Sequence, residues 1–400
     1  MSYANVQPAV FHADPCGLQT SAIDIVVKPH RVPTLTAPRE NGGGQAEAAL
    51  TAEGATLASP EPRLRYLMDA APPPGGVTEI APGIHWLRMP LSINLNHINL
   101  WLIEDGDGLT LIDTGMAEES CTAVWLALEQ TLLRERPLRR ILLTHYHPDH
   151  IGCAAWLQQR HRIPVRIAAR AMPGMHFMVH GPDAARVELS VLYFIAHGMA
   201  GARDFFATLA GIRRKSPLRL MPEVAQHLQD GEFVTVGDWH FEVIETDGHA
   251  LAHQSFFSAE PALLISGDQI LPTISPNISV SQADWGLDPL GDYLASLDLL
   301  EKLPTETLVL PSHGRPFAGL HERIADLRAH HLDDMALLLR QLDTPRSAYE
   351  LMPVLFGRQL NGFNILLGLQ ECVAHLEHLV RCEQAAREST PDGRYLYRRR

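Results

Sequence analysis

The chain has 400 residues, of which 46% are hydrophobic, so it is long enough for one large domain and smaller additions. Its formal net charge of −13 argues against a surface built to grip nucleic acid, although a local basic patch would be compatible with it. Because no run of 18 apolar residues is present, we expect no transmembrane helix and no contact with a membrane.

The cysteines and the N-terminus indicate a reducing compartment. The five cysteines are scattered, and no C-x-x-C pair occurs among them, so we expect neither a disulfide framework nor a cysteine zinc site. Cys153 follows a histidine cluster, but its position on a predicted helix favours a small core residue over a ligand. The chain does not begin with a basic segment followed by an apolar one, so we expect no secretory signal and a cytoplasmic protein.

The composition predicts three regions. Residues 1–75 contain Gly42-Gly43-Gly44 and Pro72-Pro73-Pro74 with little periodicity, which predicts a poorly ordered N-terminal extension. Residues 76–342 show regular strand and helix patterns and are the predicted main domain. Residues 343–400 form a predicted small C-terminal module.

The main domain is predicted to open with strands over 77–89, 97–104 and 109–112. The third of these ends at Asp113, beside a tight turn. A carboxylate in this position suits either the orientation of a metal-bound histidine or the N-cap of the helix predicted over 117–134, and the two roles are compatible.

A cluster of histidines then interrupts the pattern. The apolar residues 141–143 predict a buried strand, and 151–160 predict a helix, so the segment between them is a strand-to-helix turn. This turn carries four potential ligands of zinc and similar divalent cations. They are His145, His147, Asp149 and His150.

Residues 172–228 break the strand rhythm and predict a helical insertion. Helical spacing occurs over 187–197, 202–212 and 222–228, with several aromatic residues that include Tyr193. An insertion near a metal site is a candidate lid or substrate wall, and the alternative is a simple packed pair of helices.

Further strands are predicted at 232–236, 239–245, 262–266 and 307–310. Ligating side chains follow several of them, each close to a glycine or proline that lets the loop turn sharply. Since these loops should meet at one edge of a sheet, we expect the side chains to converge. The side chains are His249, Asp268 and His313.

Two helices, 290–302 and 320–342, complete the domain. The second contains His330-His331, which we interpret as a structural or surface pair and not as a pair of metal ligands. The C-terminal module begins with a capping box at Ser347. Its helices and a final hairpin predict a winged-helix-like unit. The basic end favours nucleic-acid binding slightly, but the acidic chain favours packing or homodimerisation.

These motifs resemble the metallo-β-lactamase-fold hydrolases. The H-x-H-x-D-H motif at 145–150, the later His249, Asp268 and His313, and the strand Leu111–Gly115 occur in the family's order over residues 77–340. The resemblance implies an α/β fold, a four-layer αββα sandwich with metals at one edge. A narrower likeness is to the branch of glyoxalase II and lactonase relatives with a C-terminal winged helix, which also includes an endoribonuclease.

The resemblance also implies the ligand sets. His145, His147 and His249 hold one metal, Asp149, His150 and His313 hold the other, and Asp268 bridges them. We expect two Zn²⁺ per chain, with Fe or Mn as alternatives, and open positions for water. The loop 246–253 departs from the family, because Asp247, Leu251 and Ala252 replace its usual proline and glycines.

Such a centre predicts that a hydroxide shared between the two metals attacks the carbonyl of a small acyl substrate, which is a thioester, an ester or a lactone. Asp149 is expected to steer this hydroxide and to accept or pass on its proton. The alternative enzyme is a metal-dependent endoribonuclease guided by the C-terminal module. A third hypothesis is a non-enzymatic protein whose metal is structural. A redox di-iron centre is also conceivable for this fold, but the presence of a histidine at position 147 argues against it. Pro276, Asn277 and Tyr193 are candidate substrate contacts.

Overall fold

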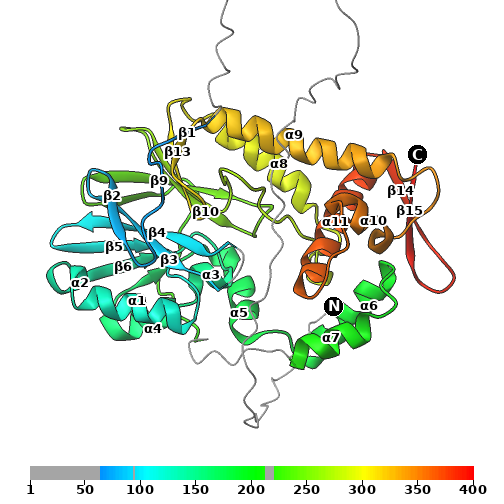
Figure 1. The fold of residues 1–400 in the computed structure, drawn as a ribbon, viewed down its shortest axis with the longest axis horizontal. Helices are drawn as coiled ribbons and strands as arrows, with labels where there is room; N and C mark the ends of the chain where they lie inside the picture. Colours follow the sequence, from blue (N-terminus) through cyan, green and yellow to red (C-terminus); the bar gives the residue numbers. More distant parts are fainter. Residues whose placement is uncertain (1–63, 93–94, 212–219) are drawn as a thin grey trace, which may run out of the picture.

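The computed structural model describes residues 64–92, 95–211 and 220–400 (Figure 1). The extension that we predicted over residues 1–75 therefore lies mostly outside the described residues. Its last part, from residue 64 onward, lies against the domain: Arg65–Tyr66 forms β1 and pairs with Phe317–Ala318, which forms β13. Arg315 fixes this segment further, because its guanidinium lies 4.0 Å from the centre of the Tyr66 ring.

Two mixed sheets form the centre of the molecule. The first sheet has the order β2-β3-β4-β5-β6-β7, and the second has the order β1-β13-β12-β11-β10-β9-β8. The first sheet comprises β2 (Val77–Ala81), β3 (Ile84–Pro90), β4 (His97–Asp105), β5 (Gly108–Ile112), β6 (Leu138–Leu142) and β7 (Val165–Arg166). The other strands of the second are β8 (Phe233–Val236), β9 (Trp239–Thr246), β10 (His253–Ser258), β11 (Leu263–Gly267) and β12 (Leu308–Pro311).

The alternation of side chains along the strands explains why the two sheets form a sandwich. On β4, Trp101 and Ile103 belong to the core between the sheets, whereas Leu100 and Leu102 belong to the core beneath the outer helices. Both faces of this strand are thus covered, and its residues 98–103 are all buried.

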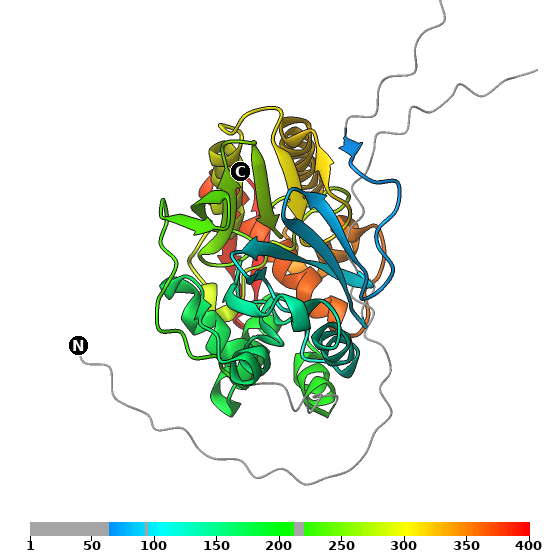
Figure 2. The same cartoon turned by 90° about the vertical axis from the view of Figure 1, so that its left-hand side faces the viewer.

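Helices cover the outer faces of both sheets. In Figure 1, α1 and α4 lie below the sheets and α8 and α9 lie above them, and the view in Figure 2 shows the same layers from the side. These helices are α1 (Glu119–Glu129), α4 (Ala154–His161), α8 (Pro289–Leu300) and α9 (Leu320–Leu339), with the short α2 (Leu132–Glu135) and α3 (Pro148–Ile151) beside them. The predicted four-layer αββα arrangement is confirmed.

Helices α6 and α7 of the insertion lie beside the C-terminal module at one end of this sandwich, whereas α5 lies nearer its middle (Figure 1). The insertion contains α5 (Met172–His180), α6 (Ala184–Ala196) and α7 (Ala202–Gly211), and the module contains α10 (Ala348–Phe356), α11 (Phe363–Arg381), β14 (Ala385–Ser389) and β15 (Tyr395–Arg399). The capping box predicted at Ser347 is present, with Ser347 and Glu350 bonded reciprocally. The module shares a continuous core with α6, α8 and α9.

Three local predictions were wrong. Residues 222–228 are not helical: Pro222 starts an extended segment in which the N–H of Leu228 donates to the carbonyl of Ile167. The loop predicted to follow His249 contains β10, whose six residues are all buried between β9 and β11. The helix α5 was not predicted separately, because its apolar residues show little concentration on one face.

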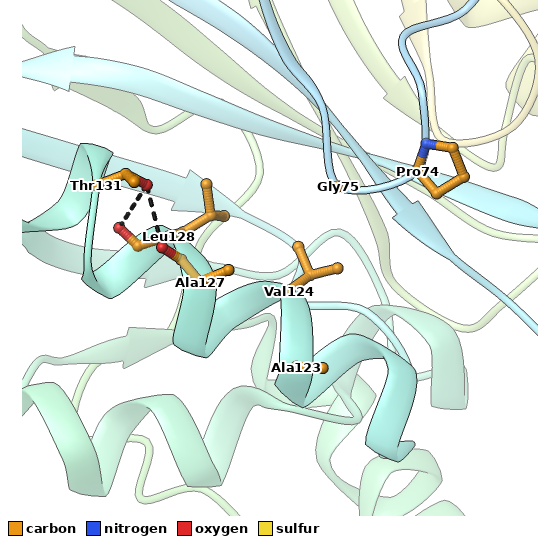
Figure 3. A pocket seen from close by; sticks show the side chains of 7 residues that line it. All are labelled: Pro74, Gly75, Ala123, Val124, Ala127, Leu128 and Thr131. Carbon is orange, nitrogen blue, oxygen red and sulfur yellow. Dashed lines mark hydrogen bonds between the residues drawn. The ribbon is translucent and has the colours of Figure 1, made fainter.

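A groove of about 410 Å³ lies on the outer side of the first sheet, between α1 and the chain before β2 (Figure 3). No potential metal ligand lines it, and the Thr131 hydroxyl is occupied by the carbonyls of Ala127 and Leu128. This groove is therefore not the predicted metal site.

In the part of the chain that the structure describes, no helix has the length and apolar character needed to cross a membrane. Within the same residues the cysteines are free thiols, and Cys153 is buried with its thiol donating to the carbonyl of Met116. This placement agrees with the packing role predicted for Cys153.

Candidate metal centre

The ends of strands from both sheets meet at one edge of the sandwich. The strands β5 and β6 run parallel in one sheet, and β11 and β12 run parallel in the other, so each pair delivers its C-terminal loops to the same edge. The N–H of Gln254 donates to the carbonyl of Thr144, and that of Asn99 donates to the carbonyl of Ser312. These bonds tie the two sheets together beside the loops that carry the predicted ligands.

Three histidine nitrogens converge in the first half of the centre. The Nε2 atom of His145 lies 2.9 Å from Nδ1 of His147 and 3.3 Å from Nε2 of His249. One tetrahedral zinc ion with bonds of about 2.0–2.1 Å places its ligand nitrogens about 3.3 Å apart. These two distances are close to the spacing that a shared ion requires.

The second half combines nitrogens with carboxylates. The Nε2 atom of His313 lies 3.2 Å from Asp149 Oδ2, and the Nε2 atom of His150 lies 3.6 Å from the same oxygen. Asp268 lies between the halves: its carboxylate is 3.5 Å from His150, His249 and His313. All seven predicted ligands are thus brought into one cluster.

Hydrogen bonds on the outer side set the tautomer of four of the five histidines. The Nδ1–H groups of His249 and His313 donate to the carbonyls of Asn277 and His97, at 3.0 and 2.9 Å. That of His150 donates to the Asp113 carboxylate at 2.7 Å. A carbonyl or carboxylate can only accept, so in the neutral imidazole it is Nε2 that carries the lone pair available to a cation.

Thr144 fixes His145 in the same way. Its hydroxyl donates to Asp113 Oδ2 at 2.8 Å, so it can only accept from Nδ1 of His145, which lies 3.0 Å away. The other oxygen of Asp113 accepts the N–H of Thr144 at 2.8 Å. Asp113 also has a φ of 59°, a left-handed conformation that aspartate tolerates better than most residues. The Asp113 carboxylate therefore orients His150 directly, whereas α1 begins later, with Glu118 at its N-cap.

The two halves differ in protonation. Burial and the neighbouring imidazoles lower the pKa of His145 far below its usual range, and burial lowers the pKa of His147 to about 3. Burial also acts on His313, but Asp268 and Asp149 outweigh it and raise the pKa of His313 to about 10. Burial likewise opposes ionisation of Asp149, yet His150 and His313 lower its pKa to about 2. His145 and His147 are thus neutral and ready to bind, while His313 holds a proton that a cation would displace.

The polar atoms at the centre of the cluster fit a divalent cation. His150 Nε2, His313 Nε2 and Asp268 Oδ1 are buried and make no hydrogen bond within the described residues. An unpartnered buried polar atom is costly, and three that face one point are explained by an ion between them. The ligands form three overlapping groups, and within each group the ligand atoms lie no more than 4.8 Å apart. The groups are His145 with His147 and His249, His145 with His150 and Asp268, and Asp149 with His150 and His313.

Our sequence reasoning missed one buried histidine of the site. His253 is fully buried on β10, and its Nε2 accepts the N–H of Asp268 at 3.1 Å. Gly267 permits this approach, because a Cβ there would lie 2.4 Å from His253 Nε2. His253 therefore positions the loop of the bridging aspartate. Its spacing of four residues after His249 is the signal that could have identified it.

The insertion contacts the site through Tyr146. The ring of Tyr146 packs on Gly174 of α5 so closely that a Cβ would lie 2.7 Å from ring atoms. The Tyr146 hydroxyl accepts the N–H of Leu251, the residue after Ala250 in the His249 loop. The start of the insertion therefore lies next to the loop that carries His145 and His147.

The three candidate substrate contacts lie in packed positions. The Tyr193 hydroxyl donates to the Val280 carbonyl at 2.6 Å, and its ring lies against His197 and Trp285. Pro276 is buried, and Asn277 is bonded through its carbonyl to His249. The observed contacts of Tyr193 and Asn277 are with the protein itself.

Comparison with known proteins gives two family matches. The model described as "Metallo-beta-lactamase superfamily" matches residues 93–313, which is more than half of the chain. The model described as "Metallo-beta-lactamase-like, C-terminal domain" matches residues 335–400. A beta-lactamase domain protein from Burkholderia ambifaria has a solved structure with a TM-score of 0.75 and 34% identity, covering 84% of this chain and 98% of that one.

Curated relatives are more distant. A hydroxyacylglutathione hydrolase from Bdellovibrio bacteriovorus is 25% identical over 44% of this chain and 49% of its own length. The acyl-coenzyme A thioesterase MBLAC2 of Bos taurus is 24% identical over 62% of this chain and 84% of its own length. The chain matches between 49% and 67% of the length of the first three relatives of this kind.

Proposed function

The chain belongs to the metallo-beta-lactamase superfamily, and we propose that this metal-dependent hydrolase cleaves thioesters, or esters and lactones, of small acyl compounds. We propose that it does so with two bound divalent cations, preferably Zn²⁺. The observation that carries this proposal is the convergence of seven ligating side chains with unpartnered nitrogens and oxygens at their centre. A structural zinc site is closed by four ligands, and seven exceed that need.

The residues divide into two ligand sets. His145, His147 and His249 would hold one cation, Asp149, His150 and His313 the other, and Asp268 would contribute to both. When bound, the cations would lower the pKa of a water molecule and polarise the substrate carbonyl.

Asp149 is the residue proposed to handle the proton. Its side chain is 13% exposed, whereas that of His313 is 4% exposed, so Asp149 is the ligand more open to an incoming water molecule. Its carboxylate stays ionised because its pKa is lowered to about 2, and an ionised carboxylate can accept a hydrogen bond from the attacking water. Water oxygen then bonds to the carbonyl carbon, the carbon–sulfur or carbon–oxygen bond breaks, and the proton passes to the leaving group.

The alternative of an endoribonuclease finds less support in the C-terminal module. Three of the five arginines between residue 385 and residue 400 form ion pairs: Arg387 with Glu377, Arg394 with Asp392, and Arg398 with Glu388. Affinity for RNA depends on basic groups that are available to phosphates. The names of the relatives likewise point to thioester substrates.

The test is a substrate panel with metal-reconstituted protein. Acyl-CoA, acyl-glutathione, an acyl homoserine lactone and RNA are offered to protein loaded with Zn²⁺, Fe²⁺ or Mn²⁺, and released thiol, ring opening and RNA fragments are measured. We expect metal-dependent turnover of at least one acyl compound and none of RNA. Cleavage of RNA without turnover of any acyl compound would overturn the proposal in favour of the nuclease.

A further inference from the structure

One short segment connects the metal centre to three helices that lie outside the sheet edge. Residues 275–280 follow β11 and carry the Asn277 carbonyl, which accepts the Nδ1–H of His249 at 3.0 Å. This bond decides which nitrogen of His249 faces the other ligands. The position of residues 275–280 therefore governs the orientation of a metal ligand.

Helix α11 of the C-terminal module holds this segment by a side-chain hydrogen bond. The side-chain amide of Asn277 donates to Oε2 of Glu371 at 2.9 Å, and Glu371 is only 5% exposed. Ser279 donates to the amide oxygen of the same asparagine, which fixes the direction of the amide group. Because the Glu371 side chain is itself enclosed, this bond limits how far Asn277 can move.

Other bonds hold the ends of the segment. At one end the Ser275 hydroxyl lies 3.2 Å from His330 Nε2 on α9. At the other end the N–H of Val280 donates to the carbonyl of Gln370 on α11, and its carbonyl accepts from Tyr193 on α6. The segment is thus fixed at both ends by neutral bonds, and in its middle by Glu371.

We propose that Glu371 is a positioning residue of the metal centre, acting through Asn277 on His249. The C-terminal module is then part of the metal site, although none of its residues is among the seven ligands. This proposal rests on the proposed function for the existence of the metal site, but it concerns binding of the cation and not turnover.

The experiment measures metal binding in the full-length protein without substrate. Metal-free wild type and the variants Glu371→Ala, Glu371→Gln and Asn277→Ala are titrated with Zn²⁺ against a chelator and with Co²⁺ followed by its visible absorption. We expect Glu371→Ala and Asn277→Ala to weaken one of the two bound cations by about tenfold to a hundredfold and to leave the other unchanged. Glu371→Gln keeps an oxygen that accepts from Asn277 and should restore most of the affinity.

The matched control is Glu377→Ala, on the same helix. Glu377 accepts from the Tyr397 hydroxyl at 2.6 Å and from Arg387 at 2.7 Å, away from the segment 275–280. The Glu377→Ala variant should have a lower melting temperature than wild type and unchanged affinities for both cations. The proposal is overturned if Glu371→Ala and Asn277→Ala bind both cations as wild type does, or if Glu377→Ala weakens binding equally. If Glu371→Ala does not fold, Asn277→Ala and Glu371→Gln decide the question.

Failure of the proposed function gives a different result. A wild type that binds its cations but hydrolyses no acyl compound contradicts the proposed substrate class. Such a result leaves the effect of Glu371 on metal affinity measurable and the positioning role decidable.

Discussion

Two groups of buried histidines lie in this protein, and only one of them is arranged to bind metal. At the sheet edge, imidazoles of His145, His147 and their partners turn ring nitrogens toward one another and toward carboxylates. Among the helices, His331 Nδ1 faces His375 Nε2 at 3.1 Å, and His375 Nδ1 donates to the carbonyl of Glu371. In the part of the chain that is described, groups of three or more potential ligands occur only at the sheet edge.

The difference follows from the elements that carry the residues. Loops after parallel strands can bring side chains from distant parts of the sequence to one point, and glycine or proline lets them turn there. Residues on packed helices face neighbouring side chains along their length, so their polar atoms find partners in pairs. The histidines of the helices therefore serve packing, as we predicted for His330 and His331.

The largest expected effect is at the bridging aspartate. Asp268→Ala removes the carboxylate 3.5 Å from three histidines, so both cations lose a ligand. We expect hydrolysis to be abolished and the metal content to fall, as measured by a thiol-release assay and elemental analysis. His331→Gln is the matched change in the helical group: it should cost about 1–3 kcal/mol of stability and leave two cations bound. Unchanged turnover in Asp268→Ala would contradict the mechanism.

A smaller effect is expected from the carboxylates that orient histidines. Asp113→Asn keeps a residue that tolerates the left-handed conformation but removes the charge beside His150. We expect metal affinity of the second half to fall by about tenfold to a hundredfold in chelator titrations.

Asp288 offers a control for that change, because it makes a similar contact with His378 in the module, at 3.0 Å. Asp288→Asn should alter stability alone. Equal losses of metal affinity in the two variants would show that the contact of Asp113 has no special role.

The helical region predicts a dependence of stability on pH. Burial, followed by the charge of Arg387, lowers the pKa of His197 to about 3. The unfolded chain binds a proton at this residue near pH 6.5, whereas the folded protein does not, so stability is full above that pH and is lost as the pH falls toward 3. The slope for one such group is about 1.4 kcal/mol per pH unit.

Metal-free wild type and His197→Gln can be compared by urea denaturation at pH 7.5 and pH 5.5, since titration of the ligands affects both equally. The variant should lose about 1–2 kcal/mol less than wild type over this interval. An identical loss in the two proteins would mean that His197 is not neutral in the folded state.

The smallest effect is expected at the surface of the hairpin. Arg398 pairs with Glu388, but both side chains are about half exposed. Arg398→Ala should change stability by about 0–1 kcal/mol and leave acyl turnover unchanged. A loss of activity toward RNA, with acyl turnover absent, would instead support the nuclease alternative.

The sequence was informative wherever local chemistry decides the structure. Apolar strands that end in glycine or proline beside a ligand predicted the loops of His145, Asp268 and His313, and the resemblance to a known family supplied their order. The capping box at Ser347 is likewise a local signal, and it is present. Asp113 was recognised as a carboxylate at a strand end, but only the structure shows that it contacts both Thr144 and His150.

Interactions between distant residues could not be predicted. Asn277 and Glu371 are 94 positions apart, and nothing in either neighbourhood indicates that they pair. Asn277 therefore looked like a substrate contact. Residues 222–228 have helical spacing, but Leu228 is held by Ile167 on the other side of the insertion. The strand of His253 was missed because its pairing with β9 and β11, and not its own pattern, makes it a strand.

The most direct test is anomalous diffraction from zinc-loaded crystals, recorded at the zinc absorption edge. The two-metal centre predicts two peaks about 3.5–4 Å apart, one among His145, His147 and His249 and the other among Asp149, His150 and His313. No peak should appear beside His331 and His375. A single peak with four protein ligands, or a peak among the helical histidines, would contradict a two-metal hydrolytic centre at the sheet edge.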